Sequence, residues 1–207
     1  AEVQRHTIEL LRQPLEERQI VIARVSGTCI FPASFMLVGA MNPCPCGYYP
    51  DMNRCTCSRQ EINSYLNRLS QPLLDRMDLS VEVLPMSYQE LTERRTEELT
   101  SASLREIVTQ VQELQRQRYR GNNNKKLHYN SELSAPDLER YCPITASGKA
   151  LLKHIFEQYH LSARAYHRII KVSRTIADIS GSEEIDEPHI QEASCFRSFD
   201  KNAWKPQ

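Results

Sequence analysis

The stretch Phe35-Met36-Leu37-Val38-Gly39-Ala40-Met41-Asn42-Pro43-Cys44-Pro45-Cys46-Gly47 decides the fold class. Its first seven residues are apolar without alternation, which is typical of a strand buried on both faces of a mainly parallel sheet. Asn42 follows this run, at the carboxyl edge where open parallel sheets present side chains to ligands. A polar side chain there can orient a water or contact a phosphate, although an Asn before Pro is more often a simple turn residue. The stretch therefore predicts an α/β domain.

Further elements of this α/β part lie on both sides of the apolar run. Residues 3–17 place apolar side chains on one helical face, which predicts a helix. Residues 19–25 favour a strand, Ser26-Gly27 provides a turn, and residues 28–31 favour a second strand, which together predict a hairpin. After the cysteines we expect a helix over residues 61–69 and a strand over residues 79–83.

Strand signals end at about residue 87, and helical periodicity follows. We expect helices over residues 103–118, 136–141, 145–159, 162–179 and 188–199. Ser162 and Asp186 are expected N-caps, and Gly181 stands where a C-terminal cap glycine is typical. The predicted organisation is α/β plus all-α, with domains over residues 1–90 and 91–200 and a tail over residues 201–207.

Charged residues are balanced, with Lys plus Arg and Asp plus Glu at 26 each. No global charge therefore attracts the chain to nucleic acid or membrane, and any such contact needs a local patch. No apolar run reaches the roughly 20 residues that span a bilayer, so we expect no membrane partner. One local patch is an expected exposed loop over residues 116–126, whose cations are Arg116, Arg118, Arg120, Lys125 and Lys126.

Seven cysteines are present, and four of them lie between residues 44 and 57. An odd total with one tight cluster favours a reducing compartment, and hence a cytoplasmic location, over a disulfide framework. The other three are isolated, and we expect them to be buried as small hydrophobic residues. They are Cys29, Cys142 and Cys195.

The clustered cysteines form two C-x-C pairs on a loop rich in proline. Four thiolates can complete a tetrahedron around Zn²⁺, and the metal would stabilise a loop with few apolar residues. Four sulfur ligands leave no open position for water, which indicates a structural rather than a catalytic ion. The alternative is a surface loop with reduced or disulfide-paired cysteines. The predicted ligands are Cys44, Cys46, Cys55 and Cys57.

Two arginines stand where a phosphate could be contacted. Arg76 lies in the segment Pro72-Leu73-Leu74-Asp75-Arg76-Met77-Asp78, and its guanidinium could stabilise a phosphoryl group transferred across a subunit boundary. A local salt bridge with Asp75 or Asp78 is the simpler interpretation. Arg164 lies in the first turn of a predicted helix, where its charge opposes the helix dipole and suggests an anionic partner. A solvated charge is the alternative there.

Three segments, in this order, resemble the signatures of one family. They are residues 38–49, residues 69–78 and the run Leu161-Ser162-Ala163-Arg164-Ala165-Tyr166-His167-Arg168-Ile169. Together they resemble magnesium-chelatase-like AAA+ proteins of the ComM/YifB type. The resemblance implies the C-terminal part of an AAA+ core, with a partial parallel sheet, a hairpin and a zinc loop, followed by a helical lid. It also implies a hexameric ring helicase that drives branch migration of DNA in recombination and natural competence.

The same resemblance implies roles for single residues. Asn42 is similar to the sensor 1 residue, and Arg76 to the arginine finger that acts on a neighbour's ATP. Arg164 is similar to the sensor 2 arginine of the lid. The hairpin over residues 19–31 is similar to the one that lines the pore, and Arg24 near its tip is the expected DNA contact.

The phosphate-binding motif G-x-x-x-x-G-K-[ST] does not occur in the sequence, nor does an apolar strand that ends in Asp-Glu. Because the family places both motifs upstream, we expect a C-terminal fragment that is inactive alone, with ATP and magnesium bound only in the full-length parent. Two alternatives stay open. One is a stand-alone zinc-containing module that binds nucleic acid or protein, and the other is an ATPase subunit of a magnesium chelatase.

Overall fold

A computed structural model describes residues 4–92, 99–120 and 127–196. The chain forms two compact units that divide between Met77 and Asp78. The first unit contains the hairpin and the four clustered cysteines, and the second contains the helices that follow. The segment over residues 78–90, which the sequence analysis assigned to the α/β part, thus groups with the helices.

The first unit begins with two short helices in place of the single predicted one. Helix α1 spans Arg5–Leu10 and α2 spans Arg12–Glu17. Pro14 explains the break, because proline has no backbone N–H to donate to the carbonyl of Leu10. Arg18 then adopts a left-handed conformation, with φ of 55°, and turns the chain from α2 into the first strand.

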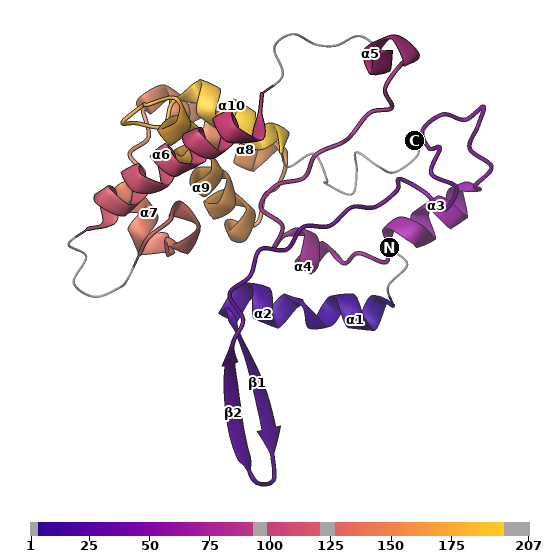
Figure 1. Cartoon of the computed structure of the whole chain (residues 1–207), viewed down its shortest axis with the longest axis horizontal. Helices are drawn as coiled ribbons and strands as arrows, with labels where there is room; N and C mark the ends of the chain where they lie inside the picture. Colours follow the sequence, from indigo (N-terminus) through magenta and orange to yellow (C-terminus); the bar gives the residue numbers. More distant parts are fainter. Residues whose placement is uncertain (1–3, 93–98, 121–126, 197–207) are drawn as a thin grey trace. The chain divides into compact units, whose positions relative to one another are not determined.

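The predicted hairpin is confirmed. Strand β1 (Gln19–Arg24) pairs antiparallel with β2 (Gly27–Pro32), and Arg24 lies opposite Gly27 beside the two-residue turn. Figure 1 shows the two strands as a narrow ribbon that extends away from α2. Both strands are almost entirely exposed, so neither face of the ribbon is covered within the described residues.

The predicted strands over residues 35–41 and 79–83 are absent from the described structure, where β1 and β2 form the sole sheet. The prediction of buried strands there was wrong for this chain. A strand needs a neighbouring strand to satisfy its backbone N–H and C=O groups, and these segments have none among the described residues. Their apolar side chains are exposed, as the exposed fractions of 87% for Met36 and 88% for Val83 indicate.

Two helices complete the first unit. Helix α3 (Arg59–Leu66) begins with a capping box, in which the side chains of the N-cap Ser58 and of Glu61 bond each other's backbone N–H groups. The predicted helix over residues 61–69 therefore exists but starts earlier. Helix α4 (Gln71–Leu74) is one turn long, and Ser70 caps it by accepting from the N–H of Leu73.

The second unit is helical, as predicted. Helix α9 packs against α6, α7, α10 and the 3₁₀ turn η1 (Figure 1). Ser162 caps α9 at its start, and Gly181 ends it with φ of 72°. The bounds are α5 (Tyr88–Thr92), α6 (Ser101–Tyr119), η1 (Asn130–Glu132), α7 (Ala135–Tyr141), α8 (Ala146–Gln158), α9 (Ala163–Ile179) and α10 (Glu187–Cys195).

A buried polar network holds α6, η1 and α9 together. The carboxylate of Asp178 is fully buried and accepts from both terminal nitrogens of Arg118 and from Nε of Arg174, the last at 3.0 Å. Gln115 and Asn130 donate to the same carboxylate at 3.2 and 2.9 Å. Two guanidinium groups thus share one buried acid, which needs this dense hydrogen bonding to offset its lost hydration.

No helix among the described residues has both the length and the apolar composition that a membrane span needs.

Candidate functional site

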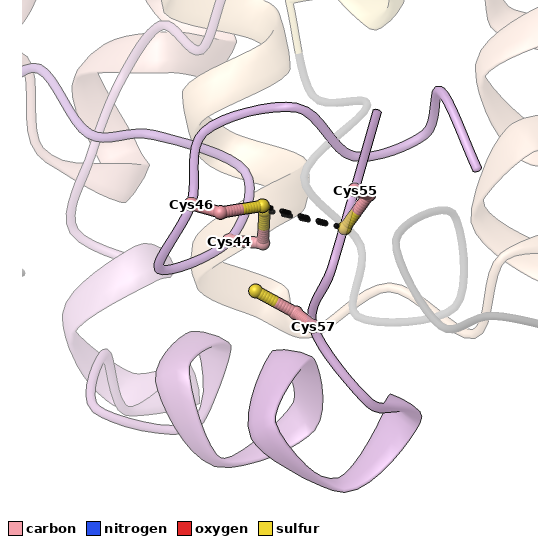
Figure 2. Close-up of side chains that lie close together, drawn as sticks. All are labelled: Cys44, Cys46, Cys55 and Cys57. Carbon is pink, nitrogen blue, oxygen red and sulfur yellow. Dashed lines mark hydrogen bonds between the residues drawn. The ribbon is translucent and has the colours of Figure 1, made fainter. Parts of the chain in front are cut away.

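The four clustered cysteines converge in space. Figure 2 shows two side chains from each end of the loop pointing toward a common centre. Their sulfur atoms all lie within 4.8 Å of one another, and the Sγ of Cys44 is 3.3 Å from that of Cys46 and 3.8 Å from that of Cys55. Cys44 is buried, and the other three are partly exposed.

This arrangement fits a tetrahedral metal ion. A Zn–S bond of about 2.3 Å implies sulfur atoms about 3.8 Å apart in a regular tetrahedron. The Sγ separations among Cys44, Cys46 and Cys55 are 3.3, 3.5 and 3.8 Å, which is close to that value. The backbone N–H of Tyr49 also donates to Cys44 Sγ at 3.4 Å, which stabilises negative charge on that sulfur. The four thiols can therefore hold a metal ion such as zinc.

Turns of the backbone bring the two pairs together. Gly47 has φ of 84°, a conformation that favours glycine, and its N–H bonds the carbonyl of Cys44. On the other side, the N–H of Cys55 bonds the carbonyl of Asp51 at 2.8 Å. The guanidinium of Arg54 stacks 4.2 Å from the ring centre of Tyr48. Local contacts thus shape the loop.

The thiols differ in acidity. A hydrogen bond with the Tyr48 backbone lowers the pKa of Cys46 to about 6, against an opposing effect of burial. At Cys57, a backbone hydrogen bond with Cys46 lowers the pKa, but burial and the neighbouring Cys46 and Cys44 outweigh it and raise the pKa to about 12. Since a metal binds thiolates, its binding would displace protons from the cluster.

Asn42 lies beside this cluster. A methyl group at Gly47 would stand 3.7 Å from the Nδ2 of Asn42, so the amide of Asn42 lies against the turn over residues 44–47. Asn42 is exposed. The predicted sensor residue and the predicted metal ligands are therefore neighbours within the first unit.

Arg76 is held by a partner that the sequence analysis did not consider. Its Nη2 donates to Glu16 Oε2, and its Nη1 donates to the carbonyl of Pro72 at 2.6 Å. Of the two local acids that the sequence offered, Asp75 accepts a hydrogen bond from Gln71 and Asp78 pairs with Arg168. The side chain of Arg76 is only 8% exposed, compared with 42% for Glu16.

The other predicted site residues lie elsewhere. Arg24 is exposed at the end of β1, in the first unit. Arg164 is exposed in the first turn of α9, in the second unit, and Arg168 lies one turn later on the same helix. Three of the five cations of the predicted basic loop have partners, since Arg116, Arg118 and Arg120 contact Tyr129, Asp178 and Glu113. Lys125 and Lys126 lie outside the described residues.

Two features escaped the sequence analysis. Glu16 and Arg76 are 60 residues apart, and no local pattern connects them. The Asp78–Arg168 pair spans 90 residues, and no local pattern connects these two residues either. The prediction that the isolated cysteines are buried was correct for Cys142 and wrong for Cys29 and Cys195. Cys29 is exposed on β2, and Cys195 is exposed at the end of α10.

Comparisons with known proteins match both units. The family described as "Magnesium chelatase, subunit ChlI" matches residues 1–91, and the family of its C-terminal part matches residues 98–197. The chain belongs to the magnesium-chelatase-like family. The resemblance noted in the sequence is thereby confirmed.

Several curated relatives align along nearly the whole chain. The competence protein ComM of Haemophilus influenzae is 44% identical over 200 residues, which cover 96% of this chain and 37% of ComM. The uncharacterized proteins YifB of Salmonella typhimurium and Escherichia coli are each 37% identical over 201 residues, or 38% of their own length. The chain thus spans little more than a third of these relatives.

Proposed function

We propose that this chain is the C-terminal part of a hexameric AAA+ ATPase that moves DNA by branch migration, in recombination and natural transformation. The observation that carries the proposal is the exposed hairpin with Arg24 beside its turn, in a chain 44% identical to a protein named for competence. A narrow ribbon with a cation beside its turn suits insertion into a ring channel that contacts DNA phosphates. In a hexamer, six such hairpins would each make a weak contact, and together they would bind DNA tightly.

Three further residues would act on ATP. Arg76 would reach the phosphates of a neighbouring subunit's nucleotide, because a guanidinium forks onto phosphate oxygens and is always charged. Arg164 would contact the nucleotide of its own subunit from the start of α9. Asn42 would orient the attacking water. Supporting these roles, Arg164 is exposed in the first turn of its helix, where its charge opposes the dipole and favours an anionic partner.

Zinc would have a structural role at the cysteine cluster. The loop precedes α3 directly, since Cys57 is followed by the N-cap Ser58. An ion held by four sulfur atoms would fix the start of α3 and the turn against which Asn42 lies. No open ligand position would be left for a water nucleophile, so this ion would not take part in hydrolysis.

A second candidate is an ATPase subunit of a magnesium chelatase, which the description of the matching family favours. The two functions share the ATPase core and differ in substrate. A DNA motor needs its hairpin to contact phosphates, whereas a chelatase needs a partner that holds the porphyrin.

The deciding experiment uses the longer protein that we propose contains this chain. ATP turnover is measured with and without a four-way DNA junction, together with the conversion of that junction to products. We expect the junction to stimulate ATP turnover. We also expect it to be converted to duplex products by branch migration only when ATP is hydrolysed. ATP turnover that is unaffected by DNA but is stimulated by a chelatase partner and porphyrin would support the second candidate instead.

A further inference from the structure

The guanidinium of Arg76 is turned inward onto acceptors of its own chain. It donates to the carboxylate of Glu16 in α2 and to the backbone carbonyl of Pro72. Its side chain is almost fully covered, although an arginine that reaches a neighbouring subunit must extend outward. The described conformation is therefore one in which Arg76 is engaged within its own unit.

The acid that holds Arg76 belongs to the root of the hairpin. Glu16 lies in the last turn of α2, two residues before Arg18, where the chain turns into β1. The carbonyl of Arg18 accepts from the N–H of Ala33 at 2.8 Å, directly after β2 ends. Both strands thus leave from one hydrogen-bonded joint, and a shift of the last turn of α2 must be transmitted to the ribbon.

We propose that Glu16 is a positioning residue that couples the arginine finger to the hairpin. While Arg76 is bound to Glu16, the hairpin root is held in one position. When Arg76 moves to the phosphates of a neighbour's nucleotide, its contact with Glu16 is lost and the root, with the hairpin, can shift. This inference rests on the proposed roles of Arg76 and of the hairpin.

Physical chemistry favours such an exchange over a permanent bond. Carboxylate and phosphate oxygens are alternative acceptors for the same guanidinium fork, and both give charge-assisted hydrogen bonds. Glu16 is partly exposed, so water can solvate its carboxylate after Arg76 leaves. The exchange would therefore replace one charge-assisted contact of Arg76 with another, as a reversible coupling requires.

The first test measures the contact in this chain alone. Phenylglyoxal modifies accessible guanidinium groups, and peptide mass spectrometry gives the modification rate of each arginine. We expect Glu16→Gln to raise the rate at Arg76 by roughly tenfold, because a charge-assisted bond is weakened. The matched control is Glu17→Gln, which changes the next residue of α2, an acid bonded to Gln13, and leaves that rate unchanged. Exposed Arg24 is the internal reference.

The second test measures coupling in the longer protein, as the ratio of ATP turnover with DNA to turnover without it. We expect Glu16→Gln to lower this ratio toward one, Glu16→Asp to restore part of it, and Glu17→Gln to leave it at the wild-type value. A merely structural role would lower both rates together and keep the ratio.

The outcomes separate this inference from the proposed function. Equal modification of Arg76 in the wild type and Glu16→Gln, an unchanged turnover ratio, or a Glu16→Gln protein without any turnover would each overturn the coupling. Full turnover in an Arg76→Ala protein would instead overturn the finger assignment, and the coupling with it. An inactive Arg76→Ala protein together with a lowered ratio in Glu16→Gln supports both.

Discussion

The Sγ atoms of Cys44 and Cys46 lie 3.3 Å apart, and only Pro45 separates the two residues in the chain. Such an approach would crowd two thiolates unless a cation or protons lie between them. The second C-x-C pair faces the first across the loop, so that all four sulfur atoms enclose one position. Four sulfur atoms around one position are what a tetrahedral metal centre requires.

We predict one equivalent of zinc per chain, bound by the four clustered cysteines. Elemental analysis of protein purified without added metal should find it, and Cys44→Ser should reduce the content at least severalfold because one of four ligands is lost. Cys195→Ser, at an exposed cysteine outside the cluster, is the control and should retain the metal. Less than about a tenth of an equivalent of any transition metal in the wild type would contradict the assignment.

The second prediction concerns nucleotide. We expect this chain alone neither to hydrolyse ATP nor to bind Mg-ATP with micromolar affinity, because its sequence contains no phosphate-binding loop of the G-x-x-x-x-G-K-[ST] type. Arg76 would act only on a neighbour's nucleotide, and Arg164 alone makes too few contacts. Calorimetric titration is the measurement, and a micromolar dissociation constant would show that the phosphate-contacting groups lie within this chain.

The third prediction tests the arginine finger in the longer protein. Arg76→Ala should lower ATP turnover by ~10³-fold or more while leaving nucleotide affinity nearly unchanged, because a finger stabilises charge that develops in the transition state. Turnover and nucleotide binding are measured on the same preparation. Arg68→Ala is a suitable control, since Arg68 lies in the same unit and its guanidinium stacks near the ring of Tyr65. Equal losses in both variants would indicate a general loss of structure.

Sequence analysis found the elements whose signals are local. The hairpin was visible because two runs that favour strands are separated by a short turn before Gly27, and α9 because Ser162 and Gly181 mark its ends. The four-cysteine cluster was predicted because its two C-x-C pairs lie on one short loop, which can bring all four sulfur atoms to one ion. The apolar run over residues 35–41 misled the prediction, since a strand is defined by its partner and not by its own composition.

Contacts between distant residues could not be predicted in the same way. Glu16 has no property that distinguishes it from Glu17, and only the folded chain shows which of the two carboxylates reaches Arg76. The same holds for Asp178, which reads as an ordinary helical acid four residues after Arg174. Its burial depends on donors from α6 and η1, which are more than 40 residues away.

The fourth prediction concerns this buried acid. Asp178→Asn should destabilise the helical unit by about 3–5 kcal/mol, because it leaves the buried guanidinium of Arg174 without its countercharge. Arg174 is only 1% exposed, so water cannot replace the lost partner. Urea unfolding followed by circular dichroism measures the effect. Glu157→Gln, which removes an exposed partner of Lys153 on α8, should change stability by less than about 1 kcal/mol. Comparable losses in the two variants would contradict the role of the network.

The last prediction concerns DNA and the hairpin. The chain carries no net charge, so binding must rest on local cations, and Arg24 is the exposed one beside the hairpin turn. The basic patch over residues 116–126 is less suited to bind DNA, because Arg118 is already paired with the buried Asp178. We therefore expect Arg24→Ala to weaken DNA binding by the assembled longer protein while basal ATP hydrolysis continues.

Salt dependence distinguishes a phosphate contact from an indirect effect of Arg24. Each phosphate that a protein neutralises lowers log affinity by roughly 0.7–0.9 per unit of log salt concentration, since bound counterions are released. Loss of Arg24 should therefore reduce the magnitude of this slope as well as the affinity, and in a ring the reduction counts every hairpin that touches DNA. Arg24→Lys retains the charge and should restore most of the slope. If the slopes and affinities of wild type and Arg24→Ala coincide, the hairpin does not contact the phosphates, and the DNA site must be sought on another surface.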